Sequence, residues 1–342
     1  MPTETAPPLS LQAVASYLPE RVVANDFFAS GTSERRGMFT APSTRRHVRG
    51  DESAVDMIEK AARRLIDQEQ IDPATEIDLL FTNVAIPDQA FTGCGAEVAA
   101  RIGARPRWIV DLHNSGCVSF VYMLDLARTL FAGSNARSAL LCCVQNAGGR
   151  LFSQAGVRAL SQAPIPGDGC GVGYVKANGH SPLLSLVQHC QPEFAADMSA
   201  IGNDGRRYWE PGTSPISIAF SDARVAAIIE RGNSLVPELV RLACRNAGVE
   251  VRNLDLLVTN QPSPIFLRNW GEALELAPGV HHHTFARLGN LFGAAIPINL
   301  EDALASSRLR PGSLLCLAGF SHAGDYGAAA VLRWQGPCPA DP

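Results

Sequence analysis

The sequence predicts a duplicated α/β fold, in which one unit of roughly 170 residues occurs twice. Residues 77–83 read IDLLFTN and residues 254–260 read LDLLVTN, 177 positions later (254 − 77). Residues 138–142, SALLC, return as GSLLC 174 positions later (312 − 138). Between these pairs each copy has an Asn followed by a helix-like run, at Asn114–Leu130 and at Asn290–Ala305. Three markers in the same order at nearly one offset indicate an internal repeat.

Each copy alternates helical periodicity with short apolar runs, the pattern of α/β layers. Helices are predicted at 54–68, 114–130, 234–247 and 290–305, and strands at Asp78–Thr82, Trp108–Leu112, Ala139–Val144, Leu254–Thr259, Ser313–Leu317 and Gly327–Trp334. Because the apolar runs lack strict alternation, we expect central strands covered on both faces. Residues 145–234 carry many Gly and Pro and are expected to form insertions and pocket loops. The two halves are predicted to be 1–178 and 179–342.

The composition excludes several classes of protein. A net charge of −4 over 342 residues argues against a nucleic-acid-binding chain, and no apolar run predicts a membrane-spanning helix. The first eight residues lack the basic and apolar regions of a secretory signal, so we expect a cytoplasmic protein. Most of the nine cysteines lie in apolar runs typical of reduced core residues. No metal-ligand spacing is present, and His281–His283 alternate in direction along a strand, so no metal site is predicted.

Cys117 is the predicted nucleophile. It follows Ser115 and Gly116 at a strand-to-helix junction rather than lying inside an apolar run. The positive end of the helix dipole is expected to lower the pKa of a thiol at this position. A thiolate reached through a glycine turn suits acyl exchange between thioesters.

At five segments the chain resembles the β-ketoacyl-acyl carrier protein synthase III family of the thiolase superfamily, over nearly its whole length. The segments are Ser43–Ser53, Gly116–Tyr122, Pro166–Gly173, Leu288–Pro297 and Phe320–Trp334. The resemblance implies a thiolase-like fold with a duplicated, five-layered αβαβα architecture, and a homodimer. It also implies Cys117 as nucleophile and Asn290 as an active-site hydrogen-bonding residue. Coenzyme A or phosphopantetheine thioesters would be substrates, with no cofactor and an acyl carrier protein as a candidate partner.

Two positions depart from the family pattern. Asn260 stands where condensing members have a His, and an amide donates hydrogen bonds but does not accept a proton at neutral pH. His322 stands in the closing loop, where the family has consecutive glycines. We therefore predict that His322 replaces the missing base as a Cys117–His322 pair, or as a Cys–His–Asp set with Asp325. The alternative is that His322 contributes only its backbone N–H. Asn260 and Asp325 are predicted to contact substrate.

The remaining polar candidates are less specific. His113 precedes the nucleophile by four residues and is expected to be a structural neighbour, whereas His189 is a candidate pocket residue. The segment at 33–42 lacks the Trp with which relatives bind coenzyme A. That difference leaves a carrier-protein donor open, and an acidic carrier surface would meet the positively charged residues Arg35, Arg36, Arg45 and Arg46.

Three functions follow from these residues. The first is an acyltransferase that loads Cys117 from a thioester and passes the acyl group to an alcohol or amine, in specialised metabolite biosynthesis. The second is a Claisen condensation, with or without decarboxylation, that forms a β-ketoacyl product. The third is a non-catalytic partner subunit of a heteromeric ketosynthase. The loss of the usual His favours the first, because transfer to a heteroatom needs a base but no decarboxylation.

Overall fold

The computed structural model describes residues 8–28, 37–89, 91–113, 115–202, 204–219 and 222–336. Its helices are α1 (Ala54–Glu69), α2 (Gly95–Ile102), α3 (Ser119–Gly133), α4 (Asp222–Asn246), α5 (Pro264–Ala273), α6 (Phe285–Leu288) and α7 (Ala295–Ala305). Its strands are β1 (Leu9–Tyr17), β2 (Arg21–Ala24), β3 (Thr44–His47), β4 (Leu79–Val84), β5 (Trp108–Leu112), β6 (Ser138–Gln145), β7 (Gly169–Ala177), β8 (Leu183–Cys190), β9 (Ser199–Gly202), β10 (Ile216–Ala219), β11 (Leu256–Thr259), β12 (His281–His282), β13 (Leu314–Ser321) and β14 (Tyr326–Arg333).

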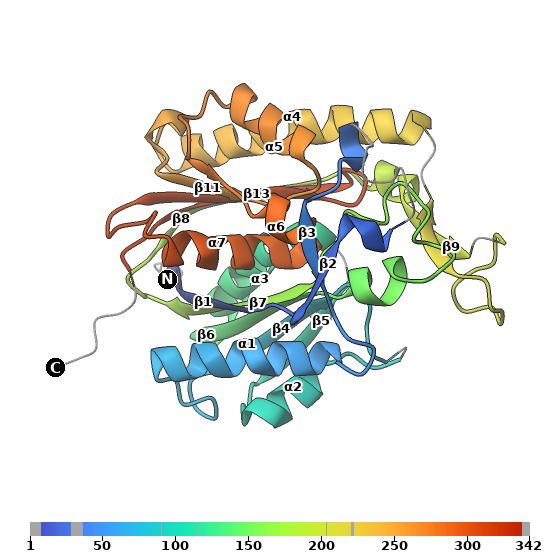
Figure 1. The fold of residues 1–342 in the computed structure, drawn as a ribbon. Coiled ribbons are helices and arrows are strands. Elements are labelled where there is room, and N and C mark those ends of the chain that lie inside the picture. Colours follow the sequence, from blue (N-terminus) through green and yellow to red (C-terminus); the bar gives the residue numbers. More distant parts are fainter. Residues whose placement is uncertain are drawn as a thin grey trace.

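Two five-stranded sheets alternate with three layers of helices. Helices α4 and α5 cover one sheet, α1 and α2 cover the other, and α3 and α7 lie between the sheets (Figure 1). The strand orders are β1-β7-β6-β4-β5 and β8-β14-β13-β11-β12. In both sheets the first two pairings are antiparallel and the last two are parallel. The predicted five-layered, duplicated architecture is confirmed, while the division at residue 178 stays a prediction.

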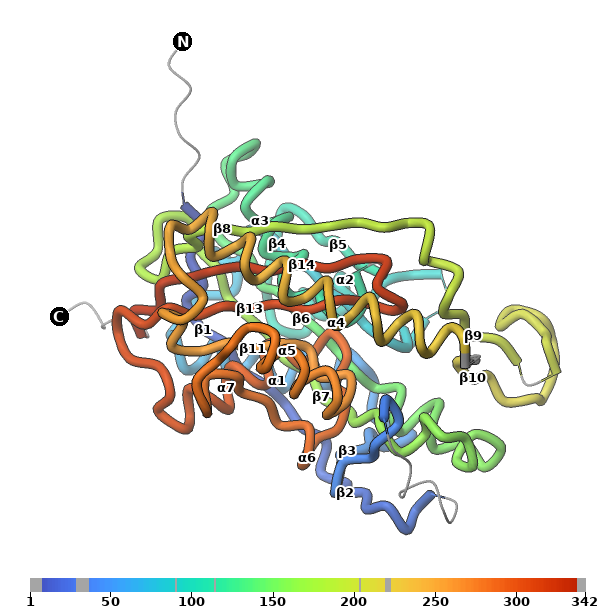
Figure 2. The backbone as a smooth tube through the Cα atoms, turned by 90° about the horizontal axis from the view of Figure 1, so that it is seen from above, coloured from blue at the N-terminus to red at the C-terminus, as the bar shows by residue number. Residues whose placement is uncertain are grey.

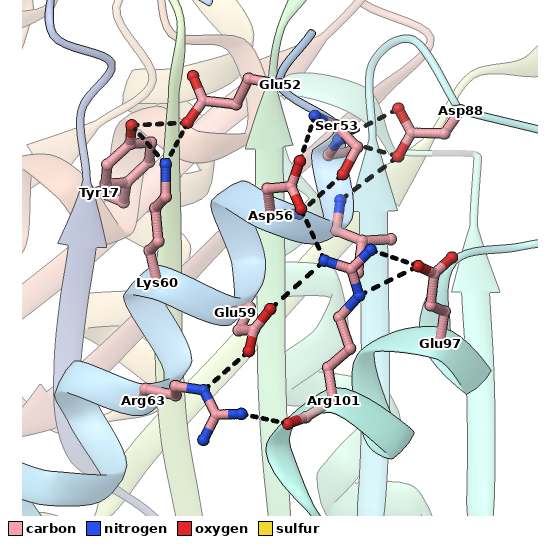
Figure 3. A network of polar contacts seen from close by, with 12 residues as sticks. Tyr17, Glu52, Ser53, Asp56, Glu59, Lys60, Arg63, Asp88, Glu97 and Arg101 are labelled. Carbon is pink, nitrogen blue, oxygen red and sulfur yellow. Dashed lines mark hydrogen bonds and ion pairs between the residues drawn. The ribbon is translucent and has the colours of Figure 1, made fainter.

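Helix α1 begins at a capping box and is tied to α2 by charged side chains. The Ser53 hydroxyl accepts a hydrogen bond from the Asp56 N–H, and the Asp56 carboxylate accepts one from the Ser53 N–H. Arg101 of α2 then pairs with Asp56, Glu59 and Glu97 (Figure 3). These side chains are partly exposed, so their pairs contribute little free energy individually. They link α1 to α2 on the outer face of the sheet.

Helix α3 forms the centre of the molecule. By length and composition the stretch Gly116–Gly133 is apolar enough to cross a membrane. In the structure it packs between the two sheets (Figure 1). Its residues Phe120, Val121 and Leu124 are fully buried in the largest core cluster. Its apolar composition is therefore that of a core helix with neighbours on both sides.

One sequence expectation is wrong, and another holds only in part. Strand β5 is an edge strand, and Trp108 and Ile109 are exposed rather than covered on both faces. The segment 145–234, expected to form insertions and pocket loops, does contain an inserted hairpin, β9–β10, beside the N-terminal end of α4 (Figure 2), but it also supplies β7, β8 and the first half of α4. The glycines of β7 mark close packing instead of turns, because a Cβ on Gly173 would lie 2.6 Å from the Phe120 ring.

Candidate active site

Cys117 lies in a tight turn between β5 and α3. Ser115 and Gly116 have positive φ angles of 66° and 33°, and a 3₁₀ turn over Gly116–Val118 leads into the helix. Burial raises the pKa of the Cys117 thiol to about 12, although hydrogen bonds from the His322 main-chain N–H and the Asn260 side chain lower it. The expected low-pKa thiolate is therefore wrong, because the loss of solvent outweighs the dipole of a helix that begins two residues later.

Asn260 follows β11 and turns its side-chain N–H toward the nucleophile. Its Nδ2 donates to the Phe320 carbonyl at 2.9 Å, and its Oδ1 accepts from the Phe320 N–H at 3.4 Å. These two contacts fix which end of the amide is nitrogen and which is oxygen. A Cβ on Gly319 would lie 2.6 Å from Oδ1, so glycine there allows the approach. The second N–H of Asn260 Nδ2 donates to the Cys117 thiol.

His322 meets Cys117 through its main chain, and its ring lies beside the same turn. Its φ of 46° is in the left-handed region, which costs free energy for any residue with a Cβ. The ring Nδ1 is 3.4 Å from Asp325 Oδ2. A Cβ on Gly116 would lie 2.7 Å from the ring Nε2, which places that nitrogen over the turn that precedes the thiol. The main-chain N–H of His322 thus contacts the thiol, and its ring lies over the preceding residue, Gly116.

Asp325 supports His322 instead of facing the cavity. Burial raises the pKa of its carboxyl, but the hydrogen bond and the charge of His322 more than offset that effect, so the pKa lies below its usual value. Asp325 is not among the residues that line the cavity, so its expected contact with substrate is wrong. Its position behind the imidazole is that of an orienting carboxylate.

Asn290 enters the site from the turn between α6 and α7. Its main-chain N–H donates to the Ile165 carbonyl at 2.9 Å, and its Oδ1 accepts from the Phe292 N–H at 3.0 Å. Since the oxygen is occupied, its side-chain N–H groups are the ones available to a bound acyl group. The structure thus brings Cys117, Asn260, Asn290 and His322 to one cavity.

That cavity has a volume of about 350 Å³ and is mainly apolar. Its walls come from α4, α5, the hairpin β9–β10 and the turn after β6. The principal apolar side chains are Met38, Phe39, Ile86, Val144, Leu151, Phe152, Ile165, Met198, Ile218, Ile228, Phe266, Phe292 and Phe320. No Lys, Arg, Asp or Glu is among the described residues that line it. The lining fits an uncharged, apolar group next to the thiol.

Asn83 is a polar lining residue that our sequence reasoning missed. It is buried beside the nucleophile turn, and its Nδ2 donates to the Leu112 carbonyl at 2.9 Å. The internal repeat contains the signal that would have found it. Asn83 ends the first copy of the repeated heptapeptide as Asn260 ends the second.

The other histidine candidates lie in several places. His113 is exposed and lines the cavity next to the nucleophile turn. His189 is exposed on β8 and is not a lining residue, so its expected pocket role is wrong. His281 contacts the Thr259 hydroxyl at 2.9 Å, and His282 contacts Asp302 at 2.9 Å.

The arginines expected to meet a carrier protein differ in position. Arg45 is fully buried, donates to the carbonyls of Val23 and Pro42, and packs against the ring of Phe28. A residue so enclosed does not reach a partner, and that expectation is wrong for Arg45. Arg46 is partly exposed and donates to main-chain carbonyls. Arg35 and Arg36 lie outside the described residues, as does Asn114.

Several known proteins are similar to this chain in sequence. A family model described as 3-oxoacyl-(acyl-carrier-protein) synthase III C terminal matches residues 244–334. β-Ketoacyl-(acyl-carrier-protein) synthase III of Thermosynechococcus vestitus is 29% identical over 302 residues, which cover 85% of this chain and 87% of the relative. The Bordetella petrii protein of the same name is 27% identical over 314 residues, with 89% and 92% covered.

Solved structures show the same fold. β-Ketoacyl-(acyl carrier protein) synthase III of Thermus thermophilus superposes with a TM-score of 0.82 at 24% identity, covering 96% of this chain and 99% of that chain. A priming β-ketosynthase of a polyketide biosynthetic pathway superposes with a TM-score of 0.82 at 19% identity, covering 99% and 100%. The family match thus covers part of the C-terminal half, the sequence relatives are β-ketoacyl-acyl carrier protein synthases III, and the solved structures show that the chain has their thiolase-like fold.

Proposed function

We propose that this enzyme is an acyltransferase. Cys117 takes an acyl group from a coenzyme A or carrier-protein thioester and passes it to an alcohol or amine acceptor. The observation that carries the proposal is the composition of the site. Cys117 and His322 line one apolar cavity, and Asp325 contacts the His322 ring from outside it, while an amide, Asn260, stands in the position of the condensation base.

In the loading step, Cys117 Sγ attacks the thioester carbonyl carbon. A bond forms between sulfur and the acyl carbon, and the bond to the donor sulfur breaks. The thiol proton passes through the His322 ring to the departing thiolate. The developing oxyanion is stabilised by main-chain N–H groups, of which that of His322 already points at the thiol.

In the transfer step, His322 Nε2 accepts the proton of the acceptor O–H or N–H as that atom attacks the acyl carbon. The bond to Cys117 Sγ breaks, and the thiolate then receives the proton from His322. Asp325 at 3.4 Å from Nδ1 orients the imidazole and stabilises its charged form. No carbon dioxide has to leave in either step, and no proton acceptor is required at Asn260.

The cavity supports an uncharged acyl group. Burying a carboxylate without a partner is costly, and no cationic side chain lies among the described lining residues. Longer hydrocarbon or aromatic acyl groups would bury their surface against Leu151, Phe152 and Phe266. A site that departs from the condensing pattern in this way suits specialised metabolite biosynthesis, which is part of the proposal.

Carbon–carbon bond formation is the second candidate. The amide groups of Asn260 and Asn290 both face the cavity that holds Cys117, and amide donors stabilise an enolate as well as a tetrahedral oxyanion. The most similar relatives reported above are named as β-ketoacyl synthases. What this candidate lacks at Asn260 is a group that gains and loses a proton.

A homodimer is part of the proposal. The exposed edge strand β5 carries Trp108 and Ile109, which are 41% and 39% exposed, and the nearby Phe91 is fully exposed. An apolar sheet edge of this kind is normally covered by a partner. Sedimentation equilibrium is expected to give twice the mass of the chain, and Trp108→Arg is expected to shift it toward the monomer. A wild-type monomer at micromolar concentration would contradict the homodimer.

Intact-protein mass spectrometry after incubation with acyl- and malonyl-thioesters tests the function. We expect an acyl adduct on the wild type that Cys117→Ala abolishes and that Cys190→Ala, which removes an exposed cysteine outside the cavity, retains. A malonyl adduct that loses carbon dioxide would favour condensation. The absence of any adduct, with coenzyme A and carrier-protein donors alike, would favour the third reading, a non-catalytic partner subunit.

A further inference from the structure

One wall of the cavity is a short turn of unusual geometry. After β6 the chain makes a π-helical turn, Gly148–Phe152, and Ala147, Leu151 and Phe152 of this segment line the cavity. Such turns are rare in proteins and are frequent at functional sites. Phe152 is 1% exposed, so its ring is held between the cavity and the core behind it.

The turn is held from behind by a single buried carboxylate. Asp168 is fully buried and lies just before β7, outside the cavity lining. Its Oδ1 accepts from the Gly148 N–H at 2.7 Å, and its Oδ2 accepts from the N–H groups of Gly149 at 2.7 Å and Val48 at 2.8 Å. Two of its three donors therefore belong to the first residues of the turn.

The two glycines allow this approach. A Cβ on Gly148 would lie 2.8 Å from Asp168 Oδ1, and a Cβ on Gly149 would lie 2.4 Å from the Val48 carbonyl oxygen. Both distances are shorter than a van der Waals contact, so a side chain at either position would push the turn away from the carboxylate. The glycines and Asp168 thus form one fitted unit.

Main-chain N–H groups stabilise the charged form of Asp168, but burial outweighs them. Burial raises the pKa of this carboxyl to about 7, against the opposing effect of its three N–H donors and of Arg150. The guanidinium of Arg150 itself pairs with Asp88 at 2.8 Å. A carboxylate without a directly paired cation depends on its hydrogen bonds, so its geometry and that of the turn are coupled.

We propose that Asp168 is a positioning residue that sets the acyl-chain selectivity of the site, by holding the turn that carries Leu151 and Phe152. The inference rests on the proposed use of Cys117 and its cavity for acyl groups. It goes beyond that proposal because Asp168 touches neither the thiol nor the cavity.

The test uses alkyl methanethiosulfonates from methyl to octyl, which react with Cys117 without any enzyme activity. Peptide mass spectrometry follows the rate at which each reagent modifies Cys117. The ratio of the octyl rate to the methyl rate reports how well the cavity wall formed by Leu151 and Phe152 fits a long chain. In Asp168→Asn, the new side-chain NH₂ group faces a main-chain N–H that the carboxylate accepted before. That hydrogen bond is lost, and we expect the turn Gly148–Phe152 to loosen. We expect the octyl-to-methyl ratio to fall about tenfold, because the long chain loses a preformed surface.

Asp78→Asn is the matched control. Asp78 also accepts two main-chain hydrogen bonds, from Arg137 and Ser138, but it lies at the opposite end of β4 from the cavity. Its substitution is expected to change stability and to leave the ratio within about twofold of the wild type.

Gly148→Ala keeps the test informative if Asp168→Asn fails to fold. Its Cβ would press on Asp168 Oδ1, and the same fall in the ratio is expected. A wild-type ratio in every folded variant would overturn the inference. If the wild type reacts selectively with alkyl reagents but forms no adduct with thioesters, the proposed function fails while the role of Asp168 is still decided.

Discussion

At the scale of single residues, the account depends on how the thiol of Cys117 is surrounded. The residue type and its place after a glycine turn are visible in the sequence, and so is the substitution of Asn260 for a His. The state of the thiol is not visible, because it depends on how many side chains from the second half of the chain close over it. Asn260 and the main chain of His322 contact the thiol from that half, and burial raises the pKa of the thiol despite their hydrogen bonds.

The pH dependence of alkylation at Cys117 follows from this burial. The reactive form is the thiolate, and with a pKa of about 12 its fraction rises about tenfold with each pH unit through the neutral range. We therefore expect the rate with iodoacetamide to increase with a slope near one from about pH 6.5 to 9. A plateau below pH 8 would show that the thiolate is stabilised in the resting enzyme.

At the scale of elements, the repeat allowed most of the fold to be predicted. β5 occurs at its predicted residues, and β4, β6, β11, β13 and β14 lie within a few residues of them. β7 was missed because its glycines resemble turn residues, and only the tertiary fold shows that Phe120 and Pro297 occupy the space above Gly173 and Gly171. The sequence around a glycine in a strand does not show which helix will pack closely on that strand.

Gly173→Ala tests that explanation. The new Cβ would lie 2.6 Å from Phe120 Cζ, and we expect a loss of about 1–3 kcal/mol in the free energy of unfolding, measured by urea denaturation. Adding Phe120→Leu should recover part of the loss. Gly133→Ala, where no atom lies within 4 Å of the new methyl group, is the control and should be close to neutral. Equal losses at Gly133 and Gly173 would contradict close packing as the cause.

At the scale of the whole molecule, buried histidines couple stability to pH. Burial lowers the pKa of His47 to about 4 and that of His281 to about 3. Both lie below the unfolded value near 6.5, so the unfolded chain binds more protons and stability is lost as the pH falls below about 6.5.

His47→Leu is expected to reduce this acid sensitivity. Between pH 7.5 and 5.5 one such histidine accounts for a loss of about 1.4 kcal/mol, which the variant should not show. Urea denaturation at the two pH values measures the difference, with His189→Leu, on an exposed part of β8, as the control. An unchanged dependence in His47→Leu would mean that His47 is not the group that titrates.

The central claim is that His322 serves the transfer of an acyl group from Cys117, and a chase of the preformed acyl-enzyme tests it directly. Wild type and His322→Gln are loaded, freed of donor, and offered amine, alcohol or malonyl-thioester acceptors. The account predicts that the wild type transfers its acyl group to an amine or alcohol without release of carbon dioxide, and that His322→Gln does so about 10²–10⁴-fold more slowly. A β-keto product with release of carbon dioxide, formed equally fast by both proteins, would contradict it.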